Sequence, residues 1–265
     1  MILDTLAASA RKRVEAAKER IPMEEMEQLA FSAREETGKG RDFSFERALS
    51  SPGISFICEV KRASPSKGII APDFPYVQIA EDYEAAGADA VSVLTEPDYF
   101  LGSSRFLTEI SRSVSLPLLR KDFTVDPYQI YEAKVMGASA VLLICSLLDT
   151  KALREGIRLC RDLGLSALTE AHDEKEIDSA LSAGAGIIGV NNRNLKTFEV
   201  DFNNSIRLRK MVPDEVLFVA ESGIKTEHDI RRLASAGVNA VLIGESLMRS
   251  PDKKKILDGF KEAAS

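Results

Sequence analysis

Two pairs of polar residues stand at the ends of apolar runs and could carry out proton transfer and anion binding. Glu59 and Lys61 end the run that begins at Ile54, and Asn191 and Arg193 end another. Side chains alternate along a strand, so residues two apart share a face and each pair points the same way. A carboxylate and an ammonium group can exchange protons with a substrate, and a guanidinium can hold an anion with two hydrogen bonds.

Further ionisable or small residues end other apolar runs of the chain. These residues are Lys121, Glu170, Glu221, Ser222, Gly223, Gly244 and Glu245, and Ser64 follows shortly after Lys61. Charged groups beside an apolar core are costly unless they are paired or used. Because ionisable groups gather at functional sites, we interpret the set as one site and not as a rim of unrelated solvated charges.

A recurring pattern identifies the elements that must position these residues. Gly87, Gly137, Gly184 and Gly237 each precede an apolar run, and they lie about fifty residues apart. Four more runs lie between them, at residues 54–61, 117–123, 165–172 and 216–223. Short, nearly continuous apolar runs are typical of parallel strands buried on both faces. Eight such strands, alternating with helices, predict an α/β fold, the closed (βα)8 TIM barrel.

Local signals predict where several of the intervening helices begin and end. Asp126 before Pro127 is a typical helix start, and Gly164 is a typical helix stop. Thr226 and Asp229 resemble a capping box. Apolar residues at helical spacing open the chain. We therefore expect one domain over residues 1–265, with residues 1–50 as an N-terminal helical extension packing on the barrel at 54–260 and helping to cover one mouth.

The loops after the last two strands predict a phosphate site. Barrels of this kind place their active sites at the carboxyl ends of the strands, and phosphate often binds after strands seven and eight. Gly223 and Gly244 lie in those loops, where glycine lets backbone N–H groups approach an anion. Glu245 carries a negative charge, so we expect its N–H to face the phosphate and its side chain to point away.

Composition excludes several classes of function. A net charge of −6 argues against general binding to nucleic acid or to anionic membranes. The longest apolar stretch, residues 140–148, is too short to span a bilayer, and the charged N-terminus is no signal peptide. Cys58, Cys145 and Cys160 form no CxxC pair, which favours free thiols and a cytoplasmic protein. His172 and His228 lack partners at metal-ligand spacing, so no metal site is expected.

The strand-end motifs resemble those of the indole-3-glycerol-phosphate synthase family across nearly the whole chain. The matching segments are EVKRASPSKG from Glu59, LTE from Leu94, RKDF from Arg120, LTEAH from Leu168, GVNNRNL from Gly189, AESGI from Ala220 and LIGESLM from Leu242. The first segment combined with RKDF is quite specific, whereas the glycine pair alone is not. The resemblance also extends to the N-terminal helical segment, which caps the active-site mouth in that family.

The resemblance implies a reaction in tryptophan biosynthesis that needs no metal and no organic cofactor. A lyase of this type converts 1-(2-carboxyphenylamino)-1-deoxyribulose 5-phosphate to indole-3-glycerol phosphate, carbon dioxide and water. Lys121 matches the family's general acid, and burial and the neighbouring Lys61 are expected to lower its pKa. Glu170 matches the usual base. Glu59 and Lys61 are candidates for the remaining acid and base work.

The same resemblance suggests how the phosphosugar substrate binds. Arg193 and Lys61 suit the substrate carboxylate, and Asn191 and Glu221 suit its hydroxyl groups. The expected phosphate site consists of Ser64, Ser222, Gly223, Gly244 and the Glu245 amide. Tyr99 and Phe100 lie beside the substrate's aromatic ring or only pack in a loop. No interface can be identified from the sequence pattern, and a monomer or a weak homo-oligomer is expected.

Three alternatives remain open at the level of sequence. One is another phosphate-binding barrel, such as phosphoribosylanthranilate isomerase or the α subunit of tryptophan synthase, although Cys58 would face away from Glu59. A second is an aldolase that forms a Schiff base on Lys121. The third is a non-catalytic phosphosugar-binding barrel or an assembly subunit, which would not require Lys121 or Glu170.

Overall fold

Eight parallel strands form a closed barrel in the computed structural model, which describes residues 2–38, 40, 42–194 and 197–264. The strands are β1 (Ser55–Val60), β4 (Ala90–Leu94), β5 (Leu118–Lys121), β6 (Ala140–Ile144), β7 (Ser166–Ala171), β8 (Ile187–Asn191), β9 (Leu217–Glu221) and β10 (Ala240–Ile243). They follow chain order around the barrel, and β10 closes it against β1, with Ser55 opposite Ala240. The predicted (βα)8 barrel is confirmed, and each predicted run contains one of its strands.

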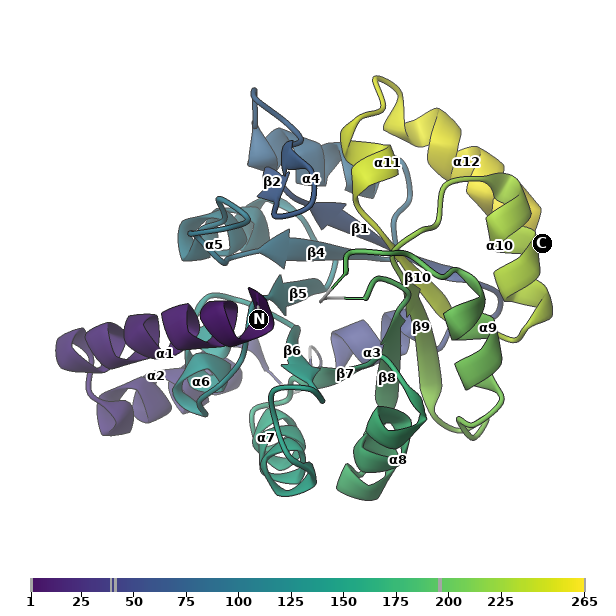
Figure 1. The fold of residues 1–265 in the computed structure, drawn as a ribbon. Helices are drawn as coiled ribbons and strands as arrows, with labels where there is room; N and C mark the ends of the chain where they lie inside the picture. Colours follow the sequence, from purple (N-terminus) through teal and green to yellow (C-terminus); the bar gives the residue numbers. More distant parts are fainter. Residues whose placement is uncertain (1, 39, 41, 195–196, 265) are drawn as a thin grey trace.

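Helices surround the barrel in the described part of the chain (Figure 1). They are α4 (Tyr76–Ala85), α5 (Ser104–Ser113), α6 (Tyr128–Val135), α7 (Thr150–Asp162), α8 (Glu174–Ala183), α9 (Asn203–Arg209), α10 (Glu227–Ser235), α11 (Glu245–Met248) and α12 (Lys253–Ala264). A small hairpin of β2 (Ala63–Ser64) and β3 (Gly68–Ile69) follows β1. The hairpin brings Ser64 back toward the mouth of the barrel, because it turns immediately after the strand that carries Glu59.

The glycines of the repeat end helices and begin strands, as the pattern predicts. Gly87, Gly137, Gly184 and Gly237 all have φ between 76° and 88°. Only glycine adopts this left-handed conformation without a steric cost, so the chain can leave each helix and turn directly into the next strand.

The predicted helix starts are also present. The Asp126 side chain accepts the N–H of Tyr128, the first residue of α6. At α10 the Thr226 side chain accepts the N–H of Asp229, whose carboxylate in turn accepts the N–H of Thr226. These bonds satisfy helix N–H groups that lack a partner in the helix, and they fix the angle at which each helix leaves its loop.

Alternation along the strands separates the barrel interior from the layer beneath the helices. In β1, Ile57 packs with the interior cluster, and Cys58 packs with the cluster between the strands and the helices. Glu59 therefore points inward at the upper end of the strand. Cys58 is fully buried on the opposite face, as expected, and burial raises the pKa of its thiol.

The N-terminal extension reaches both ends of the barrel. Helices α1 (Ile2–Arg20) and α2 (Met23–Thr37) lie side by side against α6, and the start of α1 lies at the mouth (Figure 1). Helix α3 (Ser44–Leu49) closes the opposite end, where Phe45 and Leu49 are fully buried in the interior cluster. The extension was expected to help cover one mouth, and the structure adds a plug at the base.

An arginine on α1 connects the extension to the ends of two strands. The Arg13 guanidinium donates to Asp122 at 2.8 Å and to Glu96 at 3.3 Å. Glu96 also accepts the N–H groups of Tyr99 and Phe100, and its side chain is fully buried. Asp122 directly follows Lys121, so this contact ties α1 to the end of β5.

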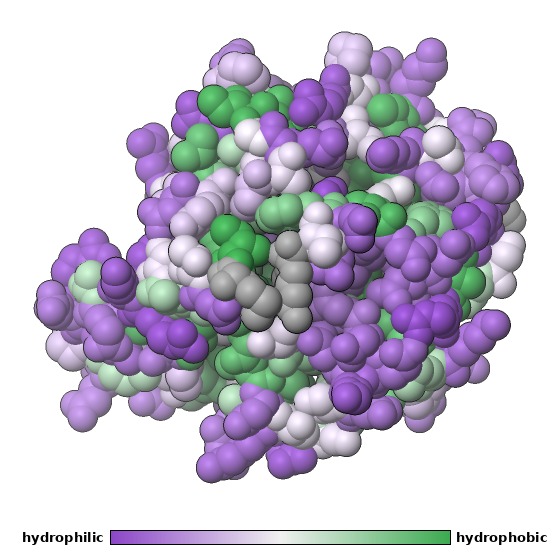
Figure 2. Space-filling model, viewed as in Figure 1, coloured by the Kyte–Doolittle hydropathy of each residue, from purple (hydrophilic) through white to green (hydrophobic). Residues whose placement is uncertain are grey.

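The face at the barrel mouth has a mixed surface. Figure 2 shows hydrophilic residues over most of this face, with hydrophobic residues near its middle and in further patches toward the top and the bottom of the view. No helix in the described ranges is long and apolar enough to cross a membrane.

Replacing Arg13 with glutamine is expected to loosen the extension. The change removes a guanidinium from two buried carboxylates, and Asp122 keeps only the longer ion pair with Arg120, at 3.7 Å. The expected cost is about 1–2 kcal/mol, since Arg13 itself is partly exposed. Urea unfolding and proteolysis of α1 measure the effect. Arg11→Gln, an exposed change on the same helix, is the control. Equal stability and equal proteolysis in the two variants would contradict the role of the contact.

Candidate functional site

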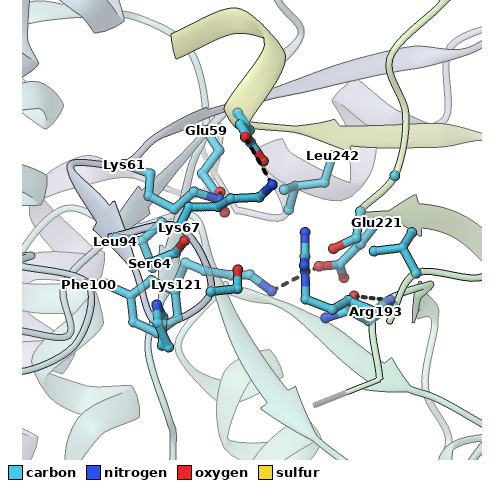
Figure 3. A pocket seen from close by; sticks show the side chains of 18 of the residues that line it. Glu59, Lys61, Ser64, Lys67, Leu94, Phe100, Lys121, Arg193, Glu221 and Leu242 are labelled. Atoms are coloured by element: carbon cyan, nitrogen blue, oxygen red, sulfur yellow. Dashed lines mark hydrogen bonds and ion pairs between the residues drawn. The ribbon is translucent and has the colours of Figure 1, made fainter. Parts of the chain in front are cut away.

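A cavity of about 760 Å³ opens at the carboxyl ends of the strands. All twelve residues predicted as catalytic, substrate-binding or phosphate-binding line it, although their roles stay predictions. Lys61, Lys121, Arg193 and Glu221 reach toward the same space from different sides (Figure 3). Strand ends that are far apart in sequence thus supply one set of groups, because the closed barrel brings them into a ring.

Three carboxylates and two lysines form the floor of the cavity. Glu59, Glu170 and Glu221 are each almost fully buried. The Lys121 ammonium donates to Glu170 Oε2 at 2.8 Å and to Glu221 Oε2 at 2.9 Å, and Lys61 pairs with Glu59. The lysines therefore neutralise charges that could not remain ionised alone at this depth.

The electrostatics around Lys121 reverse one expectation from the sequence. Burial lowers the pKa of Lys121, but the carboxylates of Glu170, Glu221 and Glu59 outweigh burial, and the pKa is raised. The expected lowering is therefore wrong, because Lys61 pairs with Glu59 and three carboxylates surround Lys121. Lys121 is an ammonium ion at neutral pH, able to donate a proton or stabilise negative charge.

The two carboxylates that share Lys121 differ in their titration. Burial raises the pKa of Glu221 to about 7, with Lys121 opposing the shift and Glu170 adding to it. Burial also acts on Glu170, but Lys121 and His172 outweigh it and lower the pKa of Glu170. Glu170 is thus a carboxylate at neutral pH and can accept a proton, whereas Glu221 is near its midpoint.

Glycine in the middle of β8 makes room for this arrangement. A Cβ at Gly189 would lie 2.4 Å from Glu221 Oε1 and 3.1 Å from Leu168 Cδ1. A second glycine makes room for the Glu59 carboxylate of β1, since a Cβ at Gly244 would lie 2.5 Å from Glu59 Oε1. Gly244 is one of the predicted phosphate-binding residues, whereas Gly189 is not among the predicted site residues. A glycine inside an apolar strand run is the signal that indicates such a close approach.

Asn191 and Arg193 lie together at the end of β8, as their spacing predicts. The Asn191 amide is within 3.4 Å of Glu170 Oε1, and its oxygen accepts the N–H of Arg193 at 3.0 Å. The Arg193 guanidinium donates to the Phe198 carbonyl at 3.3 Å and lines the cavity. It retains further N–H donors that an anionic substrate group can use.

The loop after β9 has a strained backbone where phosphate was predicted to bind. Ser222 has φ 66° and Gly223 has φ 80°, and a serine rarely adopts such a conformation. The Asn192 side chain helps to hold it, donating to the Ser222 carbonyl at 3.0 Å. Ser64 lines the cavity from the β2–β3 hairpin. Glu245 is the first residue of α11, so its N–H has no partner within the helix.

The Glu245 carboxylate does not point away from the site as expected. It lies 3.4 Å from the Arg249 guanidinium and 3.8 Å from the Lys67 ammonium, and all three residues line the cavity. Lys67 and Arg249 were not among the predicted site residues, although Lys67 lies within the first matching motif. Their positive charges attract both the carboxylate and a phosphate.

Apolar side chains form another wall of the cavity. Phe100 and Phe123 lie with ring centroids 6.2 Å apart, and Leu142 and Ile144 of β6 complete this wall. Phe100 is among the lining residues and Tyr99 is not, so contact with the substrate's aromatic ring stays a prediction for Phe100 alone. Ile2, Leu3 and Leu6 of α1 also line the cavity. A flat aromatic group fits such a surface.

The cysteines and histidines noted in the sequence differ in their burial and surroundings. Cys145 and Cys160 are free thiols, like Cys58. His228 is exposed, whereas His172 lies beside Glu170 at the strand exit. Among the residues that the structure describes, no group of three or more His, Cys, Asp or Glu side chains could hold a metal ion.

Gly189→Ala is expected to disrupt the cavity floor. The added methyl group would displace the Glu221 carboxylate from Lys121, and overpacking at such a site costs about 1–3 kcal/mol. Chemical denaturation would measure the lost stability, and a crystal structure the moved carboxylate. Gly186→Ala is the matched control, since its Cβ would meet only Glu46 Oε1, at 3.9 Å. An unmoved Glu221 in the Gly189 variant would disprove this account.

Solved structures with similar coordinates share the fold at low sequence identity. A 3-hexulose-6-phosphate synthase from Salmonella typhimurium superposes with a TM-score of 0.66 at 13% identity, covering 80% of this chain and 98% of that one. A thiamine phosphate pyrophosphorylase from Pyrococcus furiosus gives 0.59 at 15% identity, covering 80% and 95%. These likenesses support the barrel alone.

Relatives found by sequence share a much higher identity with this chain than these solved structures do. Proteins named indole-3-glycerol phosphate synthase share 56% identity in Ruminiclostridium cellulolyticum, covering 95% of both chains, and 55% in Endomicrobium trichonymphae, covering 99% of this chain and 100% of the other. The relative from Lacticaseibacillus paracasei is 51% identical over the full length of both. The family model described as indole-3-glycerol phosphate synthase matches residues 3–260. This chain belongs to the indole-3-glycerol phosphate synthase family.

Proposed function

We propose that this chain converts 1-(2-carboxyphenylamino)-1-deoxyribulose 5-phosphate to indole-3-glycerol phosphate, carbon dioxide and water, a step of tryptophan biosynthesis. The observation that carries the proposal is Lys121, held between two buried carboxylates in a cavity with both cationic and apolar walls. Family membership supplies the identity of the reaction. The residues supply the acid, the base and the anion-binding groups that it requires, without a metal or an organic cofactor.

The substrate has two anionic ends, and the cavity has a candidate site for each. Its phosphate would bind the loops after β9 and β10, through Ser64, Ser222, Gly223, Gly244 and the Glu245 N–H. Lys67 and Arg249 border this region. The anthranilate carboxylate would bind Arg193 and Lys61, while the aromatic ring packs on the apolar wall around Phe100. Asn191 and Glu221 would hold the sugar hydroxyls.

Ring closure needs an acid beside the ribulose C2′ carbonyl. As the aromatic carbon attacks, the carbonyl oxygen becomes an alkoxide, which is a stronger base than a lysine side chain. Lys121 can therefore protonate the oxygen even with its raised pKa. Positive charge develops on the anilino ring at the same time, and the Glu59 and Glu170 carboxylates stabilise it.

The later steps need one base and another acid. Loss of carbon dioxide from the substrate carboxylate leaves the electron pair of the broken C–C bond in the ring and restores its aromaticity. Dehydration then removes a proton from the ring carbon, for which Glu170 is the proposed base. It also protonates the leaving hydroxyl group, a task for the Lys61–Glu59 pair. One proton enters per turnover, because an ionised carboxylate leaves as neutral carbon dioxide.

The structure disfavours the rival chemistries. A Schiff base requires an unprotonated amine, whereas two carboxylates at hydrogen-bonding distance keep Lys121 charged. An isomerase that uses a cysteine would need a thiol facing the cavity, and Cys58 faces the outer layer. We further propose that the protein acts in the cytoplasm as a monomer or weak homo-oligomer, which sedimentation analysis can test. Its three free thiols are consistent with a reducing compartment.

Indole fluorescence tests the reaction and its two central residues. Wild type is expected to form a fluorescent product from the carboxyphenylamino substrate, and Lys121→Ala and Glu170→Gln to slow turnover by at least about a hundredfold each. Glu155→Gln, on the exposed surface of α7, serves as the control. Folded wild type that produced no indole would rule out the synthase. Trapping of a ketose phosphate by borohydride would then indicate the aldolase.

Glu245→Gln is expected to lower KM by about threefold with little change in kcat. Its carboxylate competes with the substrate phosphate for Lys67 and Arg249, and partly exposed ion pairs of this kind carry well under 1 kcal/mol. Steady-state kinetics at low salt measure the effect. Lys67→Met is the matched opposite and is expected to raise KM. A raised KM in the Glu245 variant would contradict the competition.

A further inference from the structure

His172 lies behind Glu170, among the groups that the proposed mechanism leaves unused. Its Nε2 atom is 3.5 Å from Glu170 Oε1, and its side chain is 18% exposed. Nε2 is buried and makes no hydrogen bond within the described residues. The residue is not among those that line the cavity, so it reaches the substrate only through Glu170.

The other side of the imidazole ring is fixed by the start of α8. His172 Nδ1 lies 3.0 Å from Glu176 Oε2, and the same oxygen accepts the backbone N–H of His172 at 2.8 Å. The His172 carbonyl accepts the side-chain amide of Asn204 at 3.0 Å. Backbone and ring are thus both held, and Nε2 remains directed at Glu170.

Negative charge surrounds this ring on several elements. Glu170 on β7, Glu176 on α8 and Glu221 on β9 all act on His172. Burial lowers the pKa of His172, but the hydrogen bond to Glu176 and the three carboxylates outweigh it, and the pKa is raised. Burial and the carboxylates of Glu176, Glu170 and Asp173 raise the pKa of the Cys145 thiol after β6 to about 12, so it stays neutral.

We propose that His172 is a positioning residue that, as an imidazolium ion, holds Glu170 Oε1 while Lys121 holds Oε2. This inference rests on the proposed function, in which Glu170 is the base. The imidazolium also adds a third positive charge to a floor of three carboxylates and two lysines. With both oxygens held, the carboxylate keeps one orientation and stays ionised until it accepts the substrate proton.

The proposal predicts the direction in which the pH profile moves. A positive neighbour favours the ionised form of Glu170 and lowers its pKa. Removing that charge raises the pKa of Glu170, so more of the base is protonated at a given pH. The acid limb of kcat/KM must therefore move to higher pH when His172 becomes neutral.

His172→Gln tests this prediction while keeping an N–H donor near the Nε2 position. We expect the acid limb to rise by about 0.5–1 pH unit and kcat to fall about tenfold, with KM within about twofold. Glu176→Gln should move the limb in the same direction by a smaller amount. His228→Asn, at the chain's other histidine, should leave the profile unchanged. Thermal melting confirms that each variant is folded.

NMR provides a readout that does not depend on turnover. In the His228→Asn background one imidazole remains, and we expect it to titrate above the ordinary histidine value of about 6.5. Adding Glu176→Gln should lower that midpoint. A midpoint at or below the ordinary value would overturn the proposal.

Two possible activity results test the positioning role of His172 and the proposed reaction separately. Active His172→Gln with an unmoved acid limb would overturn the positioning role, and a fall in melting temperature alone would assign the residue to structure. Inactive wild type would defeat the proposed reaction instead. In that case the NMR titration still decides whether His172 is an imidazolium beside Glu170.

Discussion

Three carboxylates buried at one end of a barrel are the constraint on which the rest of the site depends. Burial of Glu59, Glu170 and Glu221 is costly unless each carboxylate has a cationic partner. Lys121 bridges two of them, and Lys61 pairs with the third. The same balance determines the proton that Lys121 carries and the one that Glu170 lacks. Acid and base are thus defined by the same contacts.

The surrounding elements can be understood from this charged floor. Glycine in β8 and after β10 provides the space that the carboxylates occupy. The extension contributes apolar side chains above the floor, and its Arg13 binds Asp122, the residue after Lys121. A covered mouth keeps the local dielectric low, which strengthens every ion pair beneath it. The barrel and its extension therefore act on the same few groups.

Most of the fold and many of the residues at the site could be predicted because they follow from the periodic spacing of apolar and polar residues along the chain. Strand alternation places Glu59 and Lys61 on one face, and strand ends meet at one mouth in any closed parallel barrel. No such rule gives the distances between side chains that come from different sides of the barrel. The three carboxylates around Lys121 come from β1, β7 and β9, which are far apart in sequence. The direction of its pKa shift therefore depends on the three-dimensional arrangement and not on sequence spacing. The Glu245 side chain and the ring of His172 likewise depend on contacts between separate loops.

The position of the extension also has a consequence for how the chain reaches its native state. Arg13 meets Asp122, and Ala17 accepts a hydrogen bond from Tyr128, although more than a hundred residues separate each pair. Closure of the barrel joins Ser55 to Ala240. Contacts of such high sequence separation are slow to form, because loop entropy is lost before they stabilise anything. During synthesis, α1 emerges long before α6, and its apolar face lacks that partner until the first three strands of the barrel have followed.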